Sequence, residues 1–350
     1  MRPLESVDTA RNPPHWRRPL LTSSTTPRID IPGPLGFGGA PLGDMFARTD
    51  NQTAYATLEA AWNEGIRHFD TAPHYGAGLA EQRFGSFLAT KPRDEYFLST
   101  KVGRLLEPSP SGPEPDGPFV HGLWFRRRLD YGADAAKRCV EDCLQRMGVG
   151  RLDVVYIHDL AEDALGPEWT RHFQVAMQGA AKALTELREQ GVIRGWGLGV
   201  NRVEPCLRAL DEADPDVFLL ATQYHLLDTT GAEALFPRCL ERGVRVVVGS
   251  PFGSGILAGG QHYNYQDASP EALWQRDRLR HVCDRHGVDL KAAALQFSAA
   301  HPAVAAIIPG AKRPERVPQN VELMKAKIPA AFWSELRERH LLPENAHTPE

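Results

Sequence analysis

The stretch of the chain that decides its fold reads RHFDTAPHYG, residues 67–76. An apolar run breaks here into a loop, and an acid, Asp70, precedes a phenol, Tyr75, by five residues. Two later apolar runs end in the same way, one at Lys101 and the other at His158. Because the carboxyl ends of parallel strands share one rim of an α/β barrel, this spacing predicts that the four polar groups meet there.

Apolar runs of strand length recur along the chain, and most are continuous, as in parallel strands that are buried on both faces. Helical patterns lie between them, with capping residues at their starts and glycines at their ends. This alternation predicts the α/β class and a single-domain (β/α)8 TIM barrel. The expected strands are 35–38, 68–70, 96–102, 154–158, 195–200, 217–224, 244–249 and 304–308, and the expected helices are 53–64, 135–147, 176–190, 204–212, 232–242, 270–286, 290–301 and 314–326.

The domain organisation follows from the same pattern. We expect residues 31–345 to form the barrel and residues 1–30 to form an amino-terminal tail. Two segments interrupt the regular spacing, residues 105–130 after the third strand and residues 254–268 after the seventh. Both follow strands at their carboxyl ends, so they are expected to face the substrate, either of them as a lid.

Composition limits the classes of partner. The chain has 40 basic and 44 acidic residues, a net charge of -4, so neither nucleic acid nor a membrane surface is an expected partner. We expect a small-molecule substrate and a monomer or small homo-oligomer. The first residues lack a continuous apolar segment, which favours a cytoplasmic location. The five cysteines lack CxxC spacing, and no metal is expected.

The four rim residues suit proton transfer at an alcohol or carbonyl oxygen. A phenol titrates near 10, and an ammonium about 4 Å away favours the phenolate by roughly 4 kcal/mol at an effective dielectric of ~20. Lys101 is therefore expected to lower the pKa of Tyr75, the general acid or base, while Asp70 orients Lys101 and His158 positions the substrate. No side chain transfers hydride, so a nicotinamide cofactor is implied.

Two other patterns are weaker. Residues 253–258 match the dinucleotide fingerprint GxGxxA, but they fall at the seventh repeat without the expected acidic partner in a βαβ unit. His158 and Asp159 suggest a metal-dependent barrel hydrolase, but adjacent strand residues point to opposite faces and Lys101 would oppose a metal.

At these residues the chain resembles the aldo-keto reductases, whose motif Asp-x-Ala-x-x-Tyr, followed by a strand-end Lys and His, is found here as residues 70–75, Lys101 and His158. The resemblance spans residues 35–341. It implies a barrel that binds NAD or NADP. The cofactor contacts implied by it are Gly38, Gly39, Asn201, Gln223, Ser250, Pro251, Phe252, Gly253, Gly310, Lys312, Arg316 and Asn320.

The chain departs from the commoner reductases in the turn after its last strand and at the end of its seventh. Gly310 and Ala311 replace a cation and a hydroxyl that accompany a 2′-phosphate in many NADP-preferring members, which favours NAD, while Lys312, Arg313 and Arg316 keep NADP open. Gly249 stands where many members carry an aromatic ring, so that ring is missing or supplied elsewhere, with Phe252 one candidate.

These departures resemble one branch of the family, that of the L-fucose or D-threo-aldose 1-dehydrogenases and pyridoxal 4-dehydrogenase. The resemblance implies oxidation of the anomeric hydroxyl of a sugar to a lactone, with Tyr75 as general base. Oxidation of pyridoxal through its hemiacetal is the same chemistry, and both remain open. General NADPH-dependent aldehyde or ketone reduction is a further alternative. A cofactor-sensing regulatory module is the alternative outside enzymes.

Overall fold

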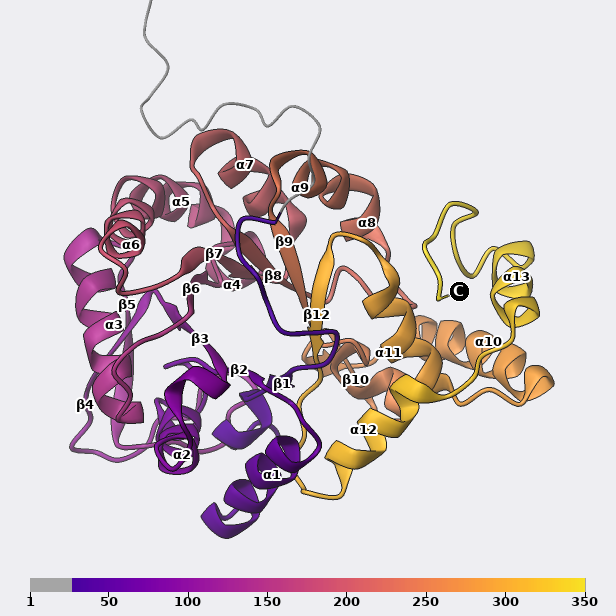
Figure 1. Cartoon of the computed structure of the whole chain (residues 1–350), viewed down its shortest axis with the longest axis horizontal. Helices are drawn as coiled ribbons and strands as arrows, with labels where there is room; N and C mark the ends of the chain where they lie inside the picture. Colours follow the sequence, from indigo (N-terminus) through magenta and orange to yellow (C-terminus); the bar gives the residue numbers. More distant parts are fainter. Residues whose placement is uncertain (1–26, 350) are drawn as a thin grey trace, which may run out of the picture.

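The computed structural model describes residues 27–349, and eight parallel strands form its centre (Figure 1). They pair in chain order, and parallel bridges from Leu35 to Ile307 and from Gly38 to Gly310 join the last strand to the first. This closure confirms the predicted single-domain (β/α)8 barrel. The barrel strands are β1 (Phe37–Gly38), β2 (His68–Asp70), β3 (Phe97–Val102), β6 (Val154–His158), β7 (Gly195–Val200), β8 (Val217–Ala221), β9 (Arg245–Gly249) and β12 (Val304–Ile308).

Alternate residues of each strand fill two separate apolar layers. In β6, Val154 and Tyr156 belong to the cluster inside the barrel, while Val155 and Ile157 join the larger cluster beneath the helices. Successive strand side chains point to opposite faces, so both layers need apolar residues and the runs are continuous. The interior cluster consists of Ile29, Ile31, Phe97, Val154, Tyr156, Val217, Leu219, Val247, Ala306 and Ile308.

Ile29 lies within the segment predicted as tail, so the ordered barrel begins slightly before the predicted boundary. The neighbouring Arg28 donates from its backbone N–H to Gly243 O over 3.0 Å and forms an ion pair with Asp214. The rest of the predicted tail, residues 1–26, lies outside the described residues. No helix in the described part of the chain is long and apolar enough to cross a bilayer.

Helices surround the strands. Asp50 caps the first of them by accepting a hydrogen bond from Thr53 N over 2.7 Å, and left-handed Gly148 ends the third long helix. The helices are α1 (Asn51–Asn63), α2 (Leu79–Leu88), α3 (Ala133–Met147), α4 (Glu162–Leu165), α5 (Trp169–Gln178), α6 (Ala180–Glu189), α7 (Val203–Glu212), α8 (Thr230–Ala234), α9 (Phe236–Arg242), α10 (Pro270–His286), α11 (Leu290–Ala300), α12 (Arg316–Lys325) and α13 (Ala330–Glu338). Figure 1 shows α10 and α13 packed together outside the ring.

Several helices differ from the prediction, among them α4 and α13, which match no predicted range. Helix α2 was not predicted, because Gly76, Ala77 and Gly78 before it all have positive φ and supply no capping side chain. The expected helix 176–190 is divided at Gly179, where a Cβ would lie 2.8 Å from Tyr131 O. The expected helix 232–242 is divided into α8 and α9, with a proline at the start of α9.

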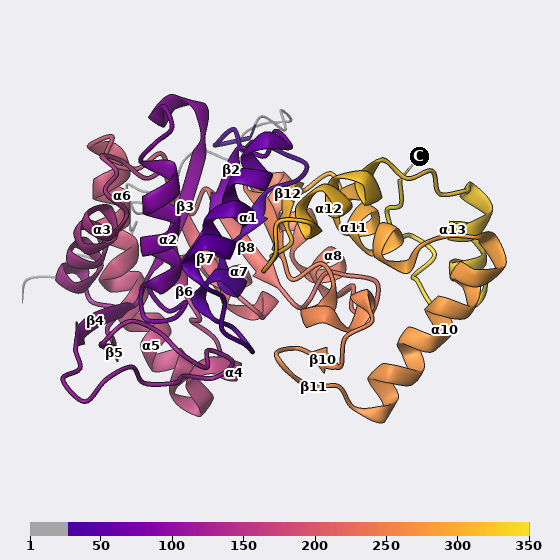
Figure 2. The same cartoon turned by 90° about the horizontal axis from the view of Figure 1, so that it is seen from below.

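The two predicted rim segments each contain an antiparallel hairpin. Strands β4 (Arg104–Pro108) and β5 (Phe125–Leu129) pair within the first, and β10 (His262–Tyr263) and β11 (Gln266–Asp267) within the second. Figure 2 shows both hairpins on the same side of the barrel. Residues of both segments line one cavity at the carboxyl ends of the strands.

Candidate active site

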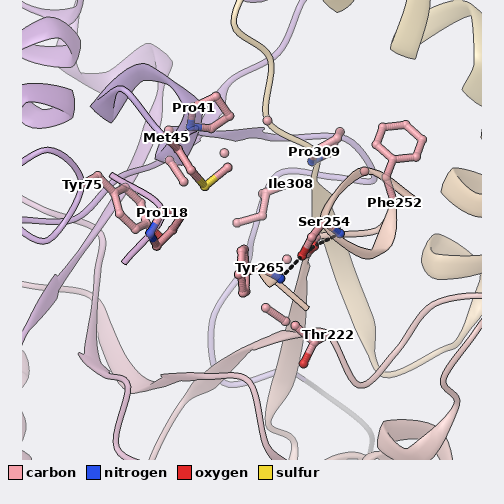
Figure 3. Close-up of a pocket in the computed structure, with 18 of the residues that line it drawn as sticks. Pro41, Met45, Tyr75, Pro118, Thr222, Phe252, Ser254, Tyr265, Ile308 and Pro309 are labelled. Carbon is pink, nitrogen blue, oxygen red and sulfur yellow. Dashed lines mark hydrogen bonds between the residues drawn. The ribbon is translucent and has the colours of Figure 1, made fainter. Parts of the chain in front are cut away.

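A cavity of about 1370 Å³ opens at the carboxyl ends of the barrel strands. This exceeds the ~300–1,000 Å³ typical of a pocket for one small ligand, so a long cofactor and a substrate fit together. Figure 3 shows Tyr75, Met45 and Pro118 on one side of it and Ile308, Pro309 and Phe252 on another. The predicted Asp70, Tyr75, Lys101 and His158 all line this cavity.

Lys101 and Asp70 form a fully buried ion pair at the base of the cavity. Lys101 Nζ donates to Asp70 Oδ2 over 2.6 Å and to Thr71 O over 2.9 Å. Ser99 Oγ donates to the other carboxylate oxygen over 2.7 Å. Burial raises the pKa of Asp70, and the ammonium and hydroxyl oppose that rise. The backbone and hydroxyl contacts fix the position of the ammonium.

The ring of Tyr75 lies next to this pair. Lys101 Nζ is 4.7 Å from its centroid, and the centroid of the His158 ring is 5.8 Å from it, edge to face. Phe119, from the segment after β3, stacks on Tyr75 with centroids 5.5 Å apart. The backbone approach is also close, because a Cβ on Gly43 would lie 2.5 Å from the Tyr75 carbonyl carbon. Tyr75 is therefore held from both sides.

The predicted direction of the Tyr75 pKa was wrong for the protein alone. Burial raises the pKa of Tyr75 well above its ordinary value, and the carboxylates of Asp70 and Asp159 add to this rise, while Arg104 opposes it. The physical reason is that the charge of Lys101 is matched by Asp70 at 2.6 Å, so little of it acts on the phenol. Tyr75 is a neutral phenol at physiological pH, and it can donate a proton.

Two histidines next to the phenol are neutral. Burial and the charges of Lys101 and Arg104 hold the pKa of His158 well below its usual range, and burial with Arg104 does the same for His74. Tyr131 fixes His158 by donating from its hydroxyl to the His158 carbonyl oxygen over 2.8 Å. A neutral imidazole can donate one N–H to a substrate oxygen without adding charge.

Most of the predicted cofactor contacts share this cavity, but two do not. Strand β8 ends at Ala221 and Thr222 has a φ of +67°, so Gln223 leaves the rim and its Oε1 accepts from Val203 N over 2.7 Å, at the start of α7. Gly253 lies beneath the loop, facing His225. The residues that do line the cavity are Gly38, Gly39, Asn201, Ser250, Pro251, Phe252, Gly310, Lys312, Arg316 and Asn320.

The far end of the cavity fits a phosphate-bearing group. Helix α12 begins at Arg316, and Lys312 and Arg313 line the approach to its amino terminus. The helix dipole attracts anions there, and the nearby cations add to that attraction. Burial lowers the pKa of Lys312, which is expected of a cation held in a partly enclosed site. This donor set suits the pyrophosphate or adenosine phosphate of a dinucleotide.

Tyr265 was not predicted as a site residue, although its segment was. Figure 3 shows its ring inside the cavity between Tyr75 and Thr222, whereas the ring of Phe252 is directed away from Tyr75. Its N–H donates to Ser254 Oγ over 3.0 Å. Positive φ values at four non-glycine residues mark this corner as strained, and such strain concentrates at functional sites. They are Ser250, Ser254, Asn264 and Tyr265.

Other cavity residues carried no recognisable signal in the sequence. Met45 follows β1, and Asp116 and Phe119 lie in the segment after β3, far along the chain from Tyr75. They reach the cavity because the loops fold over the rim, with Phe46 N bonded to Pro118 O over 2.7 Å. Only the general expectation that residues 105–130 cover the rim could have pointed to the last two.

Comparison with known proteins agrees with this geometry. The Aldo/keto reductase family model matches residues 34–340. The chain is 39% identical over 336 residues to D-threo-aldose 1-dehydrogenase of a Pseudomonas species, covering 92% of this chain and 99% of that protein. It is 40% identical over 322 residues to pyridoxal 4-dehydrogenase of Microbacterium luteolum, covering 88% and 94%.

A solved structure gives the same picture. The holo form of an aldo-keto reductase from Bacillus halodurans superimposes with a TM-score of 0.68 at 27% identity, covering 90% of this chain and 93% of that one. With the closed barrel, the cavity at its rim and these matches, the chain belongs to the aldo/keto reductase family and is an NAD(P)-dependent oxidoreductase.

Proposed function

We propose that the protein oxidises the anomeric hydroxyl of an aldose to a lactone, with Tyr75 as general acid and base. The observation that carries this proposal is the arrangement of Tyr75, His158 and the Lys101–Asp70 pair around one end of a cavity whose other end suits a dinucleotide phosphate. The similarity to D-threo-aldose 1-dehydrogenase, 39% identical over nearly its whole length, supports the sugar as substrate.

The chain's own residues handle the proton. A bound nicotinamide cofactor would supply the hydride acceptor, and the positive charge of its oxidised ring would favour the phenolate form of Tyr75. Tyr75 Oη takes the hydroxyl proton as the carbonyl bond of the lactone forms. His158, neutral in this site, donates a hydrogen bond to the same substrate oxygen. The ion pair of Lys101 and Asp70 forms the rigid floor of the cavity next to Tyr75.

We propose NAD as the preferred cofactor. In the turn after β12, Gly310 and Ala311 offer neither a cation nor a hydroxyl to a 2′-phosphate. Gly310 is also packed closely, because a Cβ there would lie 2.5 Å from Pro41 Cγ. Lys312, Arg313 and Arg316 remain available to phosphate oxygens, so use of NADP at lower efficiency is expected.

Pyridoxal is the second candidate substrate. The specific observation in its favour is 40% identity over 322 residues to pyridoxal 4-dehydrogenase. The cyclic hemiacetal of pyridoxal presents a hydroxyl on a ring carbon next to a ring oxygen, as the anomeric centre of a sugar does. The same transfer of hydride and proton then gives a lactone.

The test is formation of reduced nicotinamide by the purified protein, followed by absorbance. NAD or NADP is paired with L-fucose, D-arabinose, L-galactose or pyridoxal. The methyl glycoside of the best sugar is the matched control, because its anomeric oxygen has no proton to transfer. We expect oxidation of at least one free aldose with NAD and none of its glycoside.

Other outcomes of this panel would assign the protein differently. Oxidation of pyridoxal alone moves the assignment to the second candidate. Equal rates for the sugar and its glycoside contradict reaction at the anomeric centre. If the panel gives no oxidation and a separate assay shows aldehyde reduction with NADPH, the protein is a general reductase. Cofactor binding without turnover of any of these compounds supports a regulatory module.

A further inference from the structure

Two charged residues follow proposed catalytic residues within three positions in the sequence and line the same cavity. Arg104 is three positions after Lys101, and Asp159 is next after His158. Strands β3 and β6, which carry the two catalytic residues, are neighbours in the barrel. The turns that end these strands therefore bring the guanidinium and the carboxylate together next to the reacting end of the cavity.

Both turns have unusual backbone geometry that places these side chains. Gly103 has a φ of +110°, and a Cβ there would lie 2.4 Å from the Tyr131 ring, so only glycine allows the turn before Arg104. Asp159 has a φ of +50°. Its N–H donates to Gly199 O over 2.9 Å, which holds this strained residue at the rim.

The two side chains form an ion pair that still reaches the cavity. Arg104 Nη2 lies 2.9 Å from Asp159 Oδ2, and Asp159 Oδ1 lies 3.5 Å from His158 Nε2. The side chains of Arg104 and Asp159 are 14% and 17% exposed, and both belong to the cavity wall. A row of donor and acceptor groups thus continues from His158 along that wall.

Stability alone is a poor explanation for such a pair. Removing two charges from water costs free energy that their attraction often fails to recover, and apolar residues of similar volume are frequently as stable. Arg104 also has donors to spare, because a guanidinium carries five N–H groups, and its Nη1 has no partner among residues 27–349. These observations point to a ligand that forms hydrogen bonds with the free donors of Arg104.

We infer that Arg104 and Asp159 form a polar clamp for the hydroxyl on the carbon next to the reacting carbon of an aldose. This inference rests on the proposed function. If His158 holds the reacting oxygen, the oxygen on the adjacent carbon falls next to Asp159, which is in contact with His158. A sugar hydroxyl donates to the carboxylate and accepts from the guanidinium at once, and an apolar group does neither.

The experiment compares an aldose with its 2-deoxy analogue, which lacks that hydroxyl. The quantity measured is the ratio of kcat/KM for the two sugars. The 2-deoxy sugar cannot form the hydrogen bonds to the charged groups. With the parent enzyme, we therefore expect its kcat/KM to be about 10- to 100-fold lower than that of the aldose. The paired variant Arg104→Met with Asp159→Asn leaves no unpaired charge, and we expect its ratio to fall to about 3 or less.

A matched control comes from the same hairpin. Arg126 is 61% exposed and pairs with Glu107 outside the cavity, so Arg126→Met should keep the parental ratio. Asp159→Asn alone is the second variant, should the paired one fail to fold, and it should lose most of the discrimination. Cofactor affinity, measured by fluorescence quenching, should stay within about 3-fold of the parent in every variant.

The outcomes separate this inference from the proposed function. If the parent oxidises no aldose, the proposed function fails and the clamp fails with it. If the parent oxidises aldoses but shows no preference over the deoxy sugar, only the clamp is overturned. The same holds if Asp159→Asn and the paired variant keep the parental ratio. The clamp is supported if the variants lose the preference for the aldose over its 2-deoxy analogue while their cofactor affinity stays unchanged.

Discussion

The acid–base behaviour of Tyr75 is set by its neighbours. Asp70 lies 2.6 Å from Lys101 and compensates its charge, so burial dominates and raises the pKa of the phenol. A phenol with a raised pKa stays protonated at neutral pH, so its proton is available for reduction. It is a good acceptor for oxidation only when positive charge is near or when the pH is high.

This setting predicts opposite pH dependences for the two directions. Because oxidation needs the phenolate, kcat for aldose oxidation should rise with pH between about 6 and 10. Because reduction needs the neutral phenol, kcat for aldehyde reduction should be flat over the neutral range and fall only in alkali. Steady-state rates in both directions measure this, and an oxidation rate that falls with rising pH would contradict the assignment of Tyr75.

The sequence predicted which four groups meet, but not how their charges balance. The order of Asp70, Tyr75, Lys101 and His158 at strand ends is a local feature, and parallel strands bring such ends together. The direction of the Tyr75 pKa depends on a 2.6 Å contact and on burial, which are tertiary features. Tyr265 reaches the cavity through a strained turn that composition does not encode.

At the scale of elements, the β10–β11 hairpin brings an aromatic ring to the cavity. Ser254 fixes the backbone that carries this ring, because its Oγ accepts from Tyr265 N and its own N–H donates to Ser250 Oγ over 2.8 Å. Strand β9 ends at Gly249, which has no side chain to occupy the cavity next to Tyr265. A Cβ at Gly249 would lie 3.2 Å from Ala221 Cβ. A flat cofactor ring can therefore pack against Tyr265.

We expect Tyr265→Ala to weaken binding of the reduced cofactor about 10-fold, from the loss of an aromatic contact worth ~0.5–1.5 kcal/mol beyond buried area. Tyr265→Phe keeps the ring and should stay within about 3-fold of the parent. Titration of protein fluorescence with the cofactor measures both. Equal affinities for the alanine variant and the parent would show that the ring does not contact the cofactor.

The break between α5 and α6 is a second feature at this scale. At Gly179 a Cβ would lie 2.8 Å from Tyr131 O and 2.9 Å from Ala133 N. Gly179→Ala should therefore cost about 1–3 kcal/mol of stability. Gly150→Ala is the matched control, since nothing lies within 4 Å of a Cβ there. Urea unfolding measures both, and equal stabilities would contradict the packing described for Gly179.

Elements with complete local signals were predicted well, and those shaped by distant contacts were not. Helix α10 has Ser269 as a capping residue and Gly287 as a left-handed stop, and its predicted bounds agree with the structure. Helix α2 lacks a capping side chain. The break at Gly179 arises from Tyr131, which is distant in sequence.

At the scale of the whole molecule, buried neutral histidines link stability to pH. Burial lowers the pKa of His68 and of His225 to about 4, and it lowers those of His74 and His158 as well. At pH values between about 4, the pKa of His68 and His225 in the folded protein, and about 6.5, the pKa of an unfolded histidine, the unfolded state binds protons that the folded state does not. Stability should therefore fall as the pH drops from 7 to 5. The raised pKa of Asp70 acts in the opposite sense.

His68→Leu should reduce this pH dependence. At pH 5 each fully buried histidine with so low a pKa costs about 2 kcal/mol relative to pH 7. Removing His68 should lower the difference in unfolding free energy between pH 7 and pH 5 by about that amount. His281→Gln, at an exposed position on α10, should leave it unchanged. A parent protein equally stable at both pH values would contradict the linkage.

Tyr75 is the residue on which the proposed reaction depends most directly, and one measurement tests its role. The parent and Tyr75→Phe are compared for reduction of NAD by the best aldose, with NAD affinity measured separately by fluorescence quenching. We predict that Tyr75→Phe lowers kcat by about 10²- to 10⁴-fold, the usual contribution of a general acid or base, with NAD affinity unchanged. Turnover within a few-fold of the parent would contradict the assignment of Tyr75 as the group that moves the proton.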